Sequence, residues 1–161
     1  MALPMKRKLL LAVLAPALVV GAVLFLQQPV APEVRFTMVS GESVDTSALR
    51  GKVVVVNFWA TYCVPCLKEM PKLVQTYKKY SPRGYEMIAV AVSQDRPERV
   101  TTLAATLPFK VAFDADGTVA REFGNVRITP STFIVDREGR IVKRYVGEPE
   151  WSELHAILER L

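Results

Sequence analysis

Cys63 and Cys66 are the only cysteines of this 161-residue chain, and Val64 and Pro65 separate them. Two thiols at this spacing can close a disulfide. The spacing also suits the start of a helix, because Pro65 has no N–H to lose and a φ already set for the first turn. A thiolate there faces unpaired backbone N–H groups and the positive end of the helix dipole. The pattern predicts a reactive Cys63, with Cys66 pointing further inward.

Other uses of the two cysteines are open from the residues alone. Inert buried thiols or a structural disulfide are alternatives, although a bridge across so short a loop stabilises little. A structural zinc site needs four N or S ligands, and the single imidazole, His155, lies far along the chain, where we expect it on the surface. Soft thiolates also suit Cu(I), so a copper-binding assembly factor for an oxidase is the rival function. It lacks a convincing third ligand, and we expect no metal or other cofactor.

The N-terminal segment differs in composition from the rest of the chain. Residues 9–26 carry no charge and follow Lys6, Arg7 and Lys8. As a helix they would span about 27 Å, close to the hydrocarbon core of about 30 Å. The sequence predicts a cytoplasmic basic flank at 1–8, a transmembrane anchor at 9–26 and a stiff linker at 27–32. A cleaved signal peptide is the alternative, but its apolar region is usually shorter.

The positive residues before the anchor predict which side of the membrane holds the rest of the chain. They favour a cytoplasmic N-terminus and a single-pass protein of the cytoplasmic membrane, with its C-terminal domain in the periplasm or outside the cell. Disulfide chemistry is possible in such an oxidising compartment. After Ala31, 18 basic residues stand against 16 acidic ones, a net charge of +2. This balance gives no electrostatic footprint for nucleic acid binding.

Residues 33–161 are enough for one domain with a proper core. Apolar runs and turn residues predict strands at 52–58, 85–92 and 111–113, with hairpins at 34–44 and 132–146. Helices are expected at 63–80, 95–107, 118–123 and 151–161. This order indicates an α/β sandwich with a mixed sheet, and places the cysteines where a central strand ends.

The sequence also predicts how two of these helices begin and bend. Asp95 and Glu98 have the form of a capping box at the start of the second helix. In the first helix, Pro71 should produce a kink. The apolar positions expected to face the core in that helix are Leu67, Met70, Leu73, Val74 and Tyr77.

The residues N-F-W-A-T-Y-C-V-P-C at 57–66, Glu69 and Pro71, and T-P-S-T-F-I-V-D at 129–136 resemble a known family. The chain is similar, from about residue 32 to its end, to membrane-anchored thioredoxin-like proteins of the TlpA/ResA type. A lone C-x-x-C would be weak, but its combination with W-A before it and T-P-x-x-F after it is specific. The resemblance implies a thioredoxin fold with a mixed central sheet flanked by helices and an N-terminal β-hairpin.

The resemblance also implies roles for individual residues. Cys63 would be the exposed nucleophile and Cys66 the buried resolving thiol. Pro130 would follow a cis peptide bond and pack against the dithiol, which a Thr-Pro bond allows at small energetic cost. Thr129 would offer backbone groups to an extended segment of the partner protein. Trp59 is expected to pack beneath the motif, as part of the substrate-binding site.

Glu69 and Asn57 concern the proton chemistry of the dithiol. Asn57 stands where ordinary thioredoxin has a buried Asp, and an amide neither takes up nor releases a proton. Glu69, three residues after Cys66, matches the acid of the ResA-like group. Our hypothesis is that Glu69 relays protons for Cys66, and the alternative is a solvated helix carboxylate. Tyr62 replaces the more usual Trp before the first cysteine, which leaves substrate preference open.

Together these features predict a thiol-disulfide oxidoreductase. The Cys63 thiolate would attack a disulfide of a partner protein, and Cys66 would resolve the mixed disulfide. The resemblance implies partners in cytochrome c maturation or oxidase assembly, such as apocytochrome c or an oxidase subunit. It also implies a membrane thiol transporter as electron donor.

Overall fold

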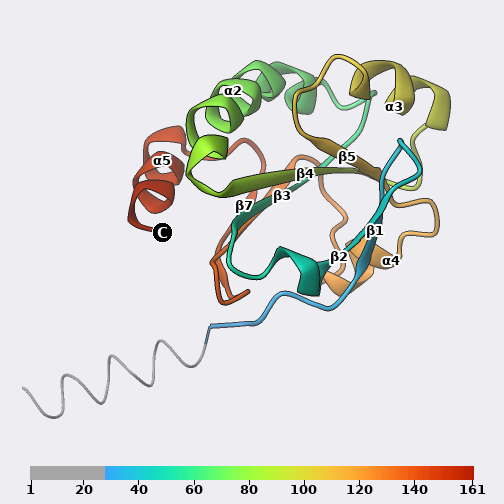
Figure 1. Ribbon diagram of the computed structural model, residues 1–161. Coiled ribbons are helices and arrows are strands. Elements are labelled where there is room, and N and C mark those ends of the chain that lie inside the picture. Colours follow the sequence, from blue (N-terminus) through green and yellow to red (C-terminus); the bar gives the residue numbers. More distant parts are fainter. Residues whose placement is uncertain (1–27) are drawn as a thin grey trace, which may run out of the picture.

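The computed structural model describes residues 28–161, so the predicted flank at 1–8 and anchor at 9–26 lie outside the described residues. A five-stranded sheet in the order β5-β4-β3-β6-β7 forms the centre of the domain (Figure 1). Its strands are β3 (Val53–Trp59), β4 (Tyr85–Ala91), β5 (Lys110–Phe113), β6 (Ser131–Val135) and β7 (Ile141–Val146). β3, β4 and β5 are parallel, whereas β6 and β7 are antiparallel to their neighbours. The mixed sheet predicted from the sequence is confirmed.

Helices and a second small sheet cover the two faces of the central sheet. One hydrophobic cluster joins one face to α2 (Val64–Tyr80), α3 (Pro97–Ala104) and α5 (Trp151–Arg160). The other face packs against α4 (Thr118–Glu122), the 3₁₀ helix η1 (Thr46–Leu49) and strand β1 (Arg35–Thr37). β1 pairs antiparallel with β2 (Ser43–Asp45), and a short 3₁₀ helix, η2 (Ser81–Arg83), follows α2.

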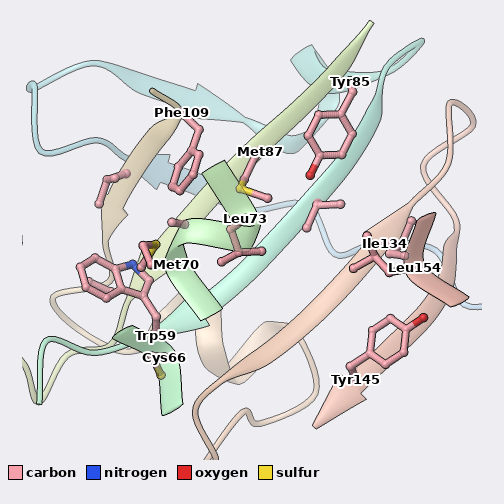
Figure 2. Close-up of a cluster of buried hydrophobic side chains, with 14 of the residues drawn as sticks. Trp59, Cys66, Met70, Leu73, Tyr85, Met87, Phe109, Ile134, Tyr145 and Leu154 are labelled. Carbon is pink, nitrogen blue, oxygen red and sulfur yellow. The ribbon is translucent and has the colours of Figure 1, made fainter. Parts of the chain in front are cut away.

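Strand β3 is buried along its whole length, because both faces of the sheet are covered. Its alternating side chains divide between two cores: Val53, Val55 and Trp59 join the cluster beneath α2, and Val54, Val56 and Phe58 join the other. Figure 2 shows the first cluster, with Cys66 close to Trp59 and Met70. The Cys63–Cys66 pair therefore lies directly above a packed core.

The chain joins the domain earlier than the predicted linker at 27–32 implies. The backbone N–H of Ile141 donates to Pro29 O at 2.7 Å, and that of Ala31 donates to Gly139 O at 2.8 Å. Ala31 is 2% exposed and belongs to the core. This part of the expected tether is thus docked on the turn between β6 and β7, where it satisfies backbone groups that would otherwise be unpaired. Within residues 28–161, no helix combines the length and apolar character needed to cross a membrane.

Helix α3 starts without the predicted capping box. Its N-cap is Arg96, no side chain caps it, and it ends at Ala104 instead of residue 107. The carboxylate of Asp95 does accept the N–H of Arg96, but its other partner is Thr61, before the cysteines. A tertiary contact has taken the place of the local cap.

Candidate active site

The two cysteines form a disulfide where the connection from β3 leads into α2. Cys63 is the N-cap of α2, and its Cα lies 5.3 Å from that of Cys66. The backbone N–H of Cys66 donates to Cys63 Sγ at 3.3 Å. An orphan donor of the first helical turn thus points at this sulfur, an arrangement that favours a thiolate once the disulfide is reduced.

The two sulfurs differ in how far solvent reaches them. Cys63 is 8% exposed, whereas Cys66 is completely buried. The surface around Cys63 is apolar, since its neighbours Tyr62 and Val64 are 56% and 60% exposed. Cys63 is therefore the sulfur nearer to solvent, and exposed apolar side chains flank it.

The peptide bond between Thr129 and Pro130 is cis, as predicted. Pro130 immediately precedes β6, whose first residue, Ser131, pairs with Phe58 of β3. This places the Thr129–Pro130 segment at the carboxyl end of β3, the end that also leads to Cys63. Pro130 is buried and its carbonyl accepts the N–H of Gly147 at 2.8 Å, whereas Thr129 is half-buried.

Trp59 lies beneath the motif, as expected, but it cannot form part of a substrate-binding surface. Its side chain is fully buried in the same cluster as Cys66 and Met70 (Figure 2). The reason is its place at the last position of β3, on the face covered by α2. Its role is to support the dithiol from below.

Glu69 is also fully buried, so the alternative of a solvated carboxylate is wrong. The side-chain N–H of Asn57 donates to Glu69 Oε1 at 2.9 Å and to Thr132 Oγ1 at 3.0 Å. Asn57 and Thr132 are paired residues of β3 and β6. The sheet thus holds the carboxyl group of Glu69 on the helix face that also carries Cys66.

The environment of Glu69 changes its proton affinity. Burial raises its pKa to about 7, while the hydrogen bond from Asn57 acts in the opposite direction. Glu148 raises this pKa further and Lys72 lowers it. Glu69 Oε2 has no hydrogen-bond partner among residues 28–161. A buried carboxyl group with one free oxygen and this pKa can change protonation near neutral pH.

Comparison with known proteins agrees with this geometry. The sequence profile of the Redoxin family matches residues 27–159. The chain belongs to the Redoxin family. It is 31% identical over 132 residues to the thiol-disulfide oxidoreductase ResA of Bacillus thuringiensis subsp. konkukian, a match that covers 81% of this chain and 76% of that protein. ResA of Bacillus subtilis is 33% identical over 117 residues, or 72% of this chain and 65% of that protein.

Solved structures place this Redoxin-family chain in the thioredoxin-like fold. A putative thioredoxin from Neisseria meningitidis superposes with a TM-score of 0.76 at 33% identity, over 83% of this chain and 90% of that one. A putative thiol:disulfide interchange protein DsbE from Chlorobium tepidum gives 0.71 at 30% identity, over 83% and 94%. With its redox pair Cys63 and Cys66, the chain is a thiol-disulfide oxidoreductase of the ResA-like group.

Two residues of this Redoxin-family site have roles that the sequence did not indicate. Asp95, buried beyond the end of β4, accepts the hydroxyl of Thr61 at 2.6 Å and also its backbone N–H, so it fixes the loop that leads to Cys63. This carboxylate was expected from the sequence to cap α3 instead. Asn57 was noted for the proton it lacks, yet its amide is the donor that holds Glu69.

His155, which was predicted to lie on the surface, is only partly exposed. It is half-buried, its Nε2 lies 3.1 Å from Thr76 Oγ1, and its ring packs edge-on against Tyr80. The imidazole thus joins α5 to α2. Within the described part of the chain, no three His, Cys, Asp or Glu side chains are grouped as metal ligands would be.

Proposed function

We propose that the protein reduces disulfides of partner proteins through Cys63. The supporting observation is the position of its sulfur, capped by the N–H of Cys66 at the start of α2. The Cys63 thiolate attacks one partner sulfur, and the other leaves as a thiolate that takes up a proton. Cys66, as a thiolate, then attacks Cys63 and releases the second partner sulfur. Two electrons pass to the partner, and the Cys63–Cys66 disulfide remains.

In this scheme Glu69 accepts the proton that Cys66 must lose before it attacks. The two residues lie three positions apart on one helix, which brings their Cβ atoms to about 5–6 Å. Both are fully buried, so water does not serve Cys66 directly. A pKa of about 7 and a free Oε2 suit Glu69 for this exchange.

Thr129 and Pro130 would bind the partner. An extended segment that carries the target cysteine would lie along the residues before β6 and pair with the backbone of Thr129, in the manner of strand addition. The half-buried Thr129, at the same end of β3 as the dithiol, supports this placement. The apolar rim formed by Tyr62 and Val64 would cover the flanks of the segment.

For cellular location, we propose a single-pass protein of the cytoplasmic membrane, anchored by residues 9–26, with the domain on the outer face. The uncharged segment after three basic residues supports this. A membrane thiol transporter would reduce the disulfide again. Clients of the protein would belong to cytochrome c maturation or oxidase assembly, as the resemblance of residues 57–66 and 129–136 to TlpA/ResA-type proteins implies.

The test is a trap for the mixed disulfide. In the Cys66→Ser variant the resolving thiol is absent, so we expect a covalent complex with the partner that thiol reagents dissolve and mass spectrometry identifies. Cys63→Ser is the matched control and should yield no complex. If Cys66→Ser traps nothing while Cys63 still reacts with an alkylating reagent, the proposed roles are wrong. Stoichiometric Cu(I) binding by the reduced protein, without disulfide reduction, would favour the copper-binding alternative.

A further inference from the structure

A groove of about 480 Å³ lies beside the dithiol. Tyr62, which precedes Cys63, and Thr129, which precedes the cis-proline, both line it. Its far side is formed by α4 and the turn that follows, with the guanidinium-bearing residues Arg121 and Arg127. A partner segment held at Thr129 would therefore pass over these two side chains.

The turn after α4 holds Arg127 in a defined place. Asn125 has a φ of 56°, in the left-handed region that a non-glycine residue seldom adopts. With its amide oriented to satisfy both groups, the Asn125 oxygen accepts from Arg127 Nη2 at 3.0 Å and from Nε at 3.2 Å. The backbone N–H of Asn125 donates to Arg121 O at 2.9 Å. This unusual turn thus orients the guanidinium before any ligand arrives.

The charges along the groove do not cancel. Among residues 28–161, Asp116 is the only carboxylate that lines it, and one of its oxygens accepts the N–H of Thr118 at 2.9 Å. Arg121 lies next to it and donates to Asp116 O at 2.8 Å and to Thr118 Oγ1 at 2.7 Å. Arg127 is exposed and has no carboxylate within ion-pair distance among residues 28–161. The groove therefore presents one uncompensated cation, about where a partner must lie.

We infer that the groove receives an acidic side chain of the partner protein close to its reactive cysteine, and that Arg127 determines this preference. The inference rests on the proposed reduction of partner disulfides. A carboxylate suits the groove because a guanidinium donates strong charge-assisted hydrogen bonds, and Nη1 is not used by Asn125. The apolar rim around Cys63 fixes the cysteine, and Arg127 selects among segments that the rim alone would accept.

The experiment uses two peptides that differ only in an Asp or a Lys two positions from a single cysteine, whose sulfur is capped as a 2-thiopyridyl disulfide. The reduced full-length chain attacks the peptide sulfur with Cys63, and the departing pyridinethiolate takes up a proton and is followed by absorbance. We expect the Asp peptide to react about tenfold faster than the Lys peptide at low salt, with the difference shrinking as salt is added.

Three variants sharpen the test. Arg127→Glu should reverse the preference, and Arg127→Gln should bring the two rates close together. Arg160→Glu, the same charge change at the exposed end of α5, should leave the preference as in the wild type. A preference that Arg127→Glu does not alter overturns the inference but leaves the reductase function standing. If wild-type protein reacts with neither peptide, the proposed function fails as well.

Discussion

Buried carboxyl groups near the two ends of β3 differ in whether a cationic side chain pairs with them. Near its amino end, Asp136 accepts from Arg140 Nη2 at 2.8 Å, and Glu86 accepts from Lys110 Nζ at 2.6 Å. Near its carboxyl end, Glu69 is more deeply buried than either, yet its one hydrogen-bond donor is the neutral amide of Asn57. The first two are compensated charges that hold the chain together. Glu69 lacks such a partner, so it can change its charge during a reaction.

The largest effect on stability is expected near the amino end of β3, where the buried carboxylates are paired with cationic side chains. Asp136→Ala removes one partner of a buried ion pair and the acceptor of the N–H groups of Glu138 and Arg140. Such losses cost about 3 to 4 kcal/mol, which denaturant unfolding will measure. The pH profile of thiol exchange should stay unchanged. A variant as stable as the wild type would show that this pair is not structural.

Near the carboxyl end of β3, the raised pKa of Glu69 should make the free energy of unfolding depend on pH. Between the ordinary value of 4.5 and about 7, the unfolded chain has lost this proton while the folded one keeps it. Stability therefore falls as pH rises through this window, by about 3 kcal/mol, and is level on either side. Glu69→Gln should lack this fall when the oxidised proteins are unfolded in urea at pH 4.5 and pH 8. An identical fall in both would contradict the assignment.

Glu69→Gln should also change the rate of thiol-disulfide exchange. If Glu69 takes the proton of Cys66, Glu69→Gln should slow release of the mixed disulfide on the order of 100-fold near neutral pH. Attack by Cys63 should change little. An unchanged release rate across the pH range would leave Glu69 as a buried acid without a role in exchange.

The smallest effect concerns the support of Asn57. Thr132→Val removes an acceptor of the Asn57 amide and should cost about 1 kcal/mol. It should also shift the pH range over which Glu69 titrates in the folded protein, because the side-chain amide of Asn57 is then free to reorient. Thr76→Val is the matched control, since Thr76 is equally buried but pairs with His155. Thr76→Val should lose a similar amount of stability but leave the pH range over which Glu69 titrates unchanged. If both variants show the same pH dependence of stability, Thr132 does not influence Glu69 through Asn57.

Much of the fold could be predicted from local patterns. The run of valines in β3 is typical of a strand covered on both faces, and the start of α2 follows from Pro65 after Cys63. The cysteines were identified by type and spacing, which a single chain is enough to reveal. The cis-proline was expected only from the resemblance to TlpA/ResA-type proteins.

The burial of Glu69 was harder to predict, because it depends on how α2 is rotated against the sheet. The apolar pattern placed Leu67 toward the core, but Leu67 is 40% exposed. The buried stripe of the helix contains Cys66, Glu69, Met70, Leu73, Thr76 and Tyr80. A stripe that includes a carboxylate and a hydroxyl is not visible as apolar periodicity. The contact of Asp95 with Thr61 was missed for a related reason, since it joins residues far apart in the chain.

The docking of Pro29 and Ala31 on the turn after β6 has a consequence for how the enzyme would be displayed. That turn and the disulfide stand at opposite ends of β3, whose seven residues separate them by roughly 20 Å. If residues 9–26 anchor the chain in a membrane, as proposed, the reactive sulfur would lie on the side of the domain that faces away from the anchor. Clients could then approach from open space, and an electron donor in the same bilayer would need a part that projects outward to reach Cys63.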